Sequence, residues 1–201
     1  MPHYVLIEGK DEETLFRHPL IGRADTKLVC CAGQGNLGFQ LEAIKNIRES
    51  DRPSLKILFD AESDQVASFK TVTDAMSEYG FDAPTEQDSW STGITPVLIH
   101  LIPGAGSPGC LEDLFLSSIQ AERTQEFACL NQLRTCWPDT PINNAKWSKL
   151  FASVLLRTTP NNDDRGVGNA LTGDKFRHLL TQEPFVQLSR ILAFLPPPAN
   201  A

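Results

Sequence analysis

The feature that most constrains the fold of this chain is the alternation of short apolar runs with amphipathic segments along its first hundred residues. Apolar runs lie at 4–7, 27–32 and 55–59, and each is long enough for a buried strand but too short for a helix. After the second and third runs, apolar residues recur at helical spacing over 37–47 and 66–79. This alternation predicts an α/β fold with a Rossmann-like parallel sheet and helices on both faces.

The remainder of the chain is expected to add one strand and a mostly helical C-terminal extension. The strand is predicted at 94–102, with Pro96 near its start, where proline is tolerated. Helices are predicted at 111–119, 123–136, 144–156 and 185–195. The segment 158–172 is rich in Asn, Asp and Gly and predicts a loop. We therefore divide the chain into an α/β core at 1–120, a helical extension packed on it at 121–195, and a frayed Pro-rich tail at 196–201.

Composition places the chain among ordinary globular proteins. Its 201 residues are 41% hydrophobic, and 18 basic against 25 acidic residues give a net charge of −7, which argues against binding nucleic acid by bulk charge alone. The five cysteines show no Cys-x-x-Cys spacing, so neither a zinc ribbon nor a disulfide framework is expected. The start does not have the pattern of a signal peptide, and no apolar run approaches the roughly 20 residues that span a bilayer. A reduced, cytoplasmic protein without membrane association is therefore expected.

Acidic residues follow three of the four predicted strands. Glu8 ends the first strand, Asp60 ends the third with Glu62 two residues later, and the fourth leads through a glycine-rich loop to Glu112. The carboxyl ends of parallel strands share one edge of the sheet, where gathered carboxylates repel unless a cation or a proton neutralises them. Oxygen ligands of this kind suit Mg²⁺ or Mn²⁺ and phosphoryl-transfer or phosphodiester-cleavage chemistry. The alternative is that each acid merely caps the helix that follows it.

These motifs resemble a Toprim domain, the catalytic module of topoisomerases, primases and certain nucleases. That family pairs a glutamate after the first strand, here Glu8-Gly9, with an Asp-x-Asp after the third, here Asp60-x-Glu62. The wider pattern is similar to small stand-alone Toprim-like proteins and to the Toprim half of overcoming-lysogenization-defect (OLD) nucleases. It covers about residues 4–195 and adds these segments: Ile7 to Glu12, Gly33-x-Gly35-Asn36-Leu37, Gly109-x-Leu111-Glu112 and Ala145-Lys146.

The resemblance implies a nuclease that depends on one or two divalent ions, Mg²⁺ or Mn²⁺. Five acids match metal-binding positions of the family: Glu8, Glu12, Asp60, Glu62 and Glu112. Glu8, Asp60 and Glu62 are expected to be catalytic, together with Lys146, which matches a late lysine that assists the transition state. Lys146 has the alternative reading of an ordinary surface lysine on an amphipathic helix. Glu62 replaces the usual aspartate, so its longer side chain would shift a metal by about one methylene.

The resemblance also implies partners: nucleic acid, with DNA favoured over RNA, and an ATPase in a phage-defence or DNA-processing complex. The sequence leaves the substrate open among DNA, RNA and a nucleotide. The sequence leaves the oligomeric state open, and a homo-oligomer is among the arrangements it allows. Two other functions remain alternatives, namely a non-catalytic interaction module on a Toprim fold and a receiver-like phosphoryl acceptor at Asp60. The segment from Gly33 to Asn36 is interpreted as a tight turn or, alternatively, as a phosphate cradle before a helix.

Overall fold

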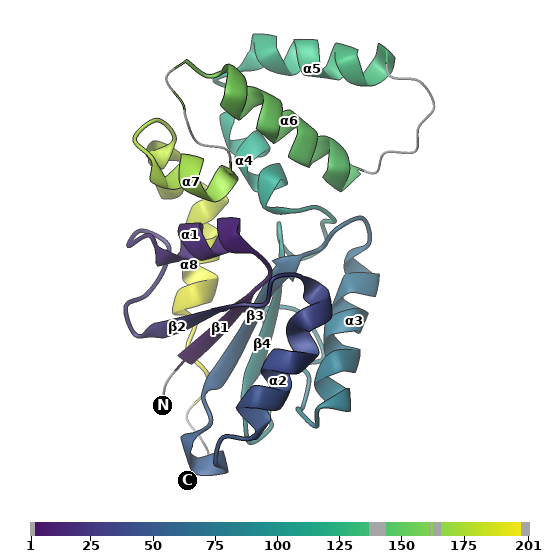
Figure 1. The fold of residues 1–201 in the computed structure, drawn as a ribbon, viewed down its shortest axis with the longest axis vertical. Coiled ribbons are helices and arrows are strands. Elements are labelled where there is room, and N and C mark those ends of the chain that lie inside the picture. Colours follow the sequence, from purple (N-terminus) through teal and green to yellow (C-terminus); the bar gives the residue numbers. More distant parts are fainter. Residues whose placement is uncertain (1–2, 137–143, 161, 163–165, 198–201) are drawn as a thin grey trace.

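The protein was analysed as a computed structural model that describes residues 3–136, 144–160, 162 and 166–197. Its centre is an all-parallel sheet with the strand order β2-β1-β3-β4 and helices on both faces (Figure 1). The four strands are β1 (His3–Ile7), β2 (Thr26–Cys30), β3 (Ser54–Asp60) and β4 (Val97–Ile102). The predicted α/β class with a Rossmann-like parallel sheet is confirmed.

The register of the strands brings their carboxyl ends to one edge. Ile7 lies opposite Cys30 on one side and Leu58 on the other, and Asp60 lies opposite Ile102. All residues of β3 and β4 are buried, because β3 is a central strand and the segment before β4 folds over the outer edge with a bridge from Trp90 to Leu98.

The fourth strand is shorter at its start than the sequence predicted. It begins at Val97 rather than at Ile94, whose side chain is 68% exposed. Thr95 and Pro96 lie between them, and Pro96 has no backbone N–H to donate to a ladder. Its carbonyl still accepts a hydrogen bond from the Leu55 backbone N–H at 2.9 Å, so proline marks the entry into the strand.

Two hydrophobic clusters cover the two faces of the sheet. On one face, α2 (Leu37–Lys45) and α3 (Gln65–Glu78) pack their apolar residues against the sheet. The other face carries α1 (Lys10–Arg17) and α8 (Phe185–Ala193), together with residues from the helical region. Short 3-10 helices at Gln34–Asn36 and Glu49–Asp51 precede α2 and β3.

The helical region stacks above the carboxyl edge of the sheet before α8 returns along it (Figure 1). It comprises α4 (Leu111–Ile119), α5 (Thr124–Cys136), α6 (Asn144–Thr158), α7 (Val167–Thr172) and a 3-10 helix at Arg177–Thr181. Trp147 and Phe151 of α6 belong to the same hydrophobic cluster as Val5 and Leu58 of the sheet. The helical region and the sheet thus share one core. No helix in the described part of the chain is long and apolar enough to cross a membrane.

The prediction of a loop over 158–172 was wrong in its second half, which forms α7. This helix packs on α1, and the Gly168 backbone N–H donates to the Asp11 carboxylate at 3.2 Å. A Cβ on Gly168 would lie 2.1 Å from the Asp11 carbonyl oxygen, so the glycine allows the close approach. Composition suggests a loop locally, but a contact with a distant helix decides the structure. Residues 161, 163–165 and, in the predicted tail, 198–201 lie outside the described residues.

Candidate functional site

Four of the predicted acids meet at the carboxyl edge of the sheet. Glu8 directly follows β1, Glu12 lies in the first turn of α1, Asp60 is the last residue of β3, and Glu112 lies in the first turn of α4. Together with Lys149 of α6 they line a pocket of about 280 Å³. Of the acids predicted to meet at the strand ends, Glu8, Asp60 and Glu112 therefore lie at one pocket, and Glu12, which the resemblance added, joins them.

Asp60 is the centre of this arrangement and is only 5% exposed. Its backbone N–H donates to Oε2 of Glu8 at 3.3 Å, which ties the ends of β3 and β1 together. Its Oδ1 accepts a hydrogen bond from the Leu111 backbone N–H at 3.1 Å, in the first turn of α4. The free N–H groups of a helix N-terminus stabilise a negative charge, so α4 both orients Asp60 and offsets part of its charge.

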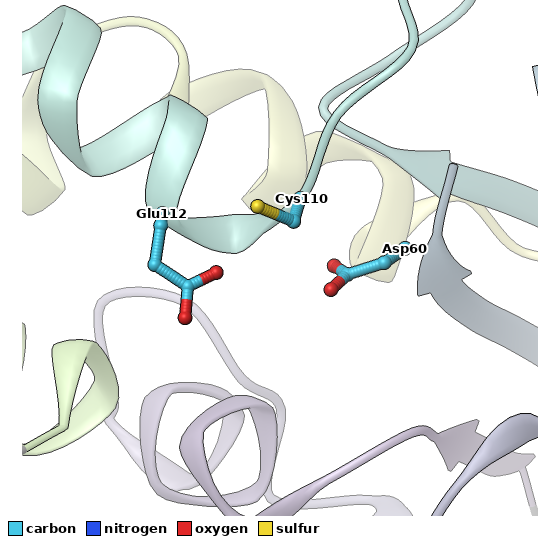
Figure 2. Close-up of side chains that lie close together, drawn as sticks. All are labelled: Asp60, Cys110 and Glu112. Atoms are coloured by element: carbon cyan, nitrogen blue, oxygen red, sulfur yellow. The ribbon is translucent and has the colours of Figure 1, made fainter. Parts of the chain in front are cut away.

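Cys110 is a neighbour of the acids that the motif analysis did not single out. Ligand atoms of Asp60, Cys110 and Glu112 all lie within 4.8 Å of one another, and Figure 2 shows the two carboxylates separated by an open space with the thiol beside it. Burial raises the pKa of the Cys110 thiol, and its Sγ donates to Asp113 Oδ2 at 3.2 Å. These three side chains could hold a cation between them, and the two carboxylates offer the oxygen ligands that Mg²⁺ or Mn²⁺ prefers.

Burial sets the protonation of the acids. It raises the pKa of Asp60 well above the ordinary value, and the nearby charges of Glu12 and Glu112 raise it further. Burial likewise raises the pKa of Glu12. It also raises the pKa of Glu8, although the hydrogen bond from the Asp60 backbone N–H acts in the opposite direction. Desolvation and like charges disfavour the ionised forms, so a cation in this pocket would relieve both costs.

Two lysines line the pocket, Lys10 and Lys149, and Lys149, which pairs with the acids, was not predicted from the sequence. Its Nζ lies 3.5 Å from Oδ2 of Asp60 and 3.3 Å from Oε1 of Glu62. Burial lowers the pKa of Lys149, but Asp60, Glu62 and Glu112 raise it by more, so the ammonium stays charged. The predicted Lys146 is exposed three residues earlier on α6 and is not among the described residues that line the pocket. Helical spacing from the buried Ala145 would have indicated position 149, one turn later on the same face.

Glu62 lies at the side of this pocket rather than in its lining. Its backbone has a left-handed φ of 52° and forms an isolated antiparallel bridge with Gly109, next to the glycine loop. Its side chain is 40% exposed, pairs with Lys149, and borders a second pocket. Lys149 therefore links Glu62 to Asp60, because its ammonium pairs with both carboxylates.

The glycine segment before α2 forms a tight turn at the same edge. Gly33 has a φ of 109°, a conformation that favours glycine, and its N–H donates to the carbonyl of Glu8 at 2.9 Å. The turn thus fixes the backbone that carries Glu8.

Compared with protein families, with curated proteins and with solved structures, the chain shows no significant match. The resemblance to Toprim proteins therefore remains a prediction from the sequence, and function must be argued from the residues of the site.

Proposed function

We propose that this chain is a divalent-metal-dependent phosphodiester hydrolase that cleaves nucleic acid, DNA rather than RNA. One observation carries the proposal: the four predicted acids Glu8, Glu12, Asp60 and Glu112 converge on one pocket that Lys149 also lines. Such a grouping is unfavourable by itself, and a bound cation turns it into a binding site for a phosphate.

Glu8, Glu12, Asp60 and Glu112 would hold Mg²⁺ or Mn²⁺ through their oxygens. When bound, such an ion would polarise a phosphate oxygen and lower the pKa of a water molecule. The Leu111 N–H keeps Asp60 oriented, and its second oxygen faces Lys149. The Lys149 ammonium would neutralise the charge that develops on the phosphate as its bond to the leaving oxygen breaks.

The buried acids also bear on proton transfer. Burial raises the pKa values of Asp60 and Glu12, so ionising these groups costs more in the metal-free protein than in water. Cation binding requires their ionised forms, so metal affinity should increase with pH. Once ionised, a carboxylate of this kind is a suitable acceptor for the proton of an attacking water.

The direct test is hydrolysis of bis(para-nitrophenyl) phosphate and nicking of plasmid DNA in Mg²⁺ or Mn²⁺, with EDTA as the blank. We expect Glu8→Gln and Asp60→Asn to abolish both activities. The matched control is Glu78→Gln, an exposed acid in the last position of α3. Cleavage that persists unchanged in the Glu8 and Asp60 variants would remove the proposed site.

The resemblance extends the proposal to a complex with an ATPase in phage defence or DNA processing. The net charge of −7 supports a partner that supplies basic surface for DNA. Adding the candidate ATPase should then increase nicking without changing hydrolysis of the small diester. A chain that binds the ATPase but hydrolyses neither substrate would instead be the non-catalytic interaction module.

A phosphoryl acceptor at Asp60 is the second candidate, favoured by the ammonium of Lys149 at 3.5 Å. An ammonium in this position would neutralise an incoming phosphoryl group. Incubation with acetyl phosphate and Mg²⁺ would then give an acid-stable, base-labile acyl phosphate that Asp60→Asn abolishes. No such product is expected from a hydrolase.

A further inference from the structure

A second and larger pocket lies beside the acids and has no role in the chemistry above. It has a volume of about 500 Å³ and lies next to the glycine loop, α5 and α6. Two acids, one arginine and two neutral polar residues are among the residues that line it: Glu62, Asp113, Arg134, Asn144 and Ser148. Glu62 borders this pocket and pairs with Lys149, which lines the pocket of the acids, so one ion pair lies between the two.

The two acids of the second pocket already have partners within the fold. Asp113 accepts a hydrogen bond from the Cys110 backbone N–H at 2.8 Å through Oδ2, and one from the Ser148 hydroxyl through Oδ1. Glu62 accepts from Lys149 at 3.3 Å. Their negative charge is therefore balanced locally by a helix N-terminus and by an ammonium.

Arg134 differs because its partners are neutral. Its Nη2 donates to the Asn144 side-chain oxygen at 2.7 Å, and its guanidinium lies 5.7 Å from the centre of the Trp147 ring. The ion pairs among the described residues do not include Arg134, and its side chain is exposed at the pocket. The amide and the ring hold the guanidinium in place and leave its charge and remaining N–H groups for an anion.

We propose that this second pocket binds a phosphate that flanks the scissile one along the same nucleic-acid strand, with Arg134 as the residue that contacts it. The inference rests on the proposed hydrolase function and adds to it a second contact with the nucleic-acid strand, outside the pocket of the acids. Neighbouring phosphates of a strand would occupy the two pockets on either side of the Lys149–Glu62 pair. Arginine suits this role because its planar fork matches phosphate oxygens.

The first experiment measures binding without turnover. Anisotropy of a dye-labelled single-stranded DNA oligonucleotide is titrated with the full chain in Ca²⁺ over a range of salt concentrations. We expect Arg134→Gln to weaken affinity by about fivefold and to reduce the slope of log K against log salt by about 0.7, the value for one lost contact to a single strand. Arg134→Lys keeps the charge and should retain the slope.

The matched control is Arg157→Gln, which removes the same charge from an exposed position in the last turn of α6. It should leave affinity and slope unchanged. A second variant keeps the Arg134 side chain but pairs its charge. Asn144→Asp places a carboxylate against the guanidinium and should weaken binding as Arg134→Gln does. This variant separates the loss of charge from any loss of packing.

Kinetics distinguish this inference from the proposed function. Arg134→Gln should raise KM for the oligonucleotide with kcat unchanged, and should leave hydrolysis of bis(para-nitrophenyl) phosphate at the wild-type rate, because that substrate has one phosphate. If the wild type hydrolyses the small diester but Arg134→Gln and Arg157→Gln lower oligonucleotide affinity equally, the phosphate subsite is overturned and the hydrolase stands. If the wild type hydrolyses neither substrate, the proposed function fails and this inference fails with it.

Discussion

Lys149 on α6 lies 3.5 Å from Oδ2 of Asp60 at the end of β3. The contact joins the helical region to the sheet at the point where the acids gather. It also places a permanent positive charge beside the acid whose ionised form burial disfavours most. The candidate site is thus built from two parts of the chain that are distant in sequence.

Replacement of Lys149 should impair catalysis more than folding. Lys149→Met removes the charge that faces Asp60, and we expect the rate of phosphodiester hydrolysis to fall by about 100-fold, as when one group that stabilises developing charge is lost. Lys146→Met, three residues earlier on the same helix, should keep the wild-type rate. The opposite ranking of the two variants would return the transition-state role to Lys146.

Replacement of Asp60 should stabilise the metal-free protein while it abolishes metal binding. The folded state holds the Asp60 proton more tightly than the unfolded state, because burial raises the pKa in the fold. The contribution of Asp60 to stability therefore falls as pH rises above about 4, which is the ordinary pKa of an aspartate in an unfolded chain. Asp60→Asn keeps the acceptor for the Leu111 N–H and removes the charge, so a gain of about 1 kcal/mol or more is expected at neutral pH.

The measurement is urea unfolding in EDTA at neutral pH and near pH 4. The stability gain of Asp60→Asn should shrink at the lower pH, where the wild-type carboxyl is protonated in the folded state and about half protonated in the unfolded chain. An Asp60→Asn protein that is less stable than the wild type at neutral pH would show that Asp60 is a favourable structural charge.

Lys56 should make stability depend on pH at the opposite end of the sheet. It is 3% exposed in β3, its Nζ donates to the Leu192 carbonyl near the end of α8, and burial lowers its pKa from 10.5 to about 8. Between these values the unfolded chain binds more protons than the folded one, so the Lys56 contribution to stability rises with pH across that window. Relative to Lys56→Met, the wild type should gain on the order of 3 kcal/mol from pH 8 to above pH 10.

This difference is measured by denaturant unfolding of both proteins at several alkaline pH values. Taking the difference cancels the titration of groups that the two proteins share. Parallel pH profiles would mean that Lys56 is not desolvated in solution.

Gly168 should be intolerant of a side chain. In Gly168→Ala the added Cβ would meet the Asp11 carbonyl oxygen at 2.1 Å, and α7 would have to move away from α1. We expect a loss of about 2 kcal/mol in unfolding free energy. Gly35→Ala is the control, because a Cβ there meets nothing within 4 Å. Equal stability of the two variants would show that α7 does not pack closely on α1 in solution.

The part of the fold predicted from sequence is the part governed by local pattern. Short apolar runs that end at Glu8 and Asp60 indicated both the parallel strands and the edge at which acids meet, because strand direction fixes where the chain emerges. Helical spacing places Ala145 and Lys149 on the same face of α6, but no window of neighbouring residues shows that this face meets Asp60. Lys149 was missed for that reason.

Positions governed by tertiary contacts were also predicted less well. The segment that forms α7 has a loop-like composition and becomes helical against α1. Glu62 follows Asp60 as the motif requires, but its left-handed backbone and the bridge to Gly109 place it at the side of the pocket. The spacing of acids along the chain did not contain this information.

Because Lys149 of α6 contacts Asp60 of β3, the order of synthesis along the chain decides when the site can form. Glu8, Glu12, Asp60 and Glu112 all leave the ribosome before Lys149 does. A nascent chain that has folded its strands would therefore present the acids without their ammonium partner. The complete site can form only after α6 has been synthesised and has docked, so the Lys149–Asp60 contact reports that the chain has folded through α6.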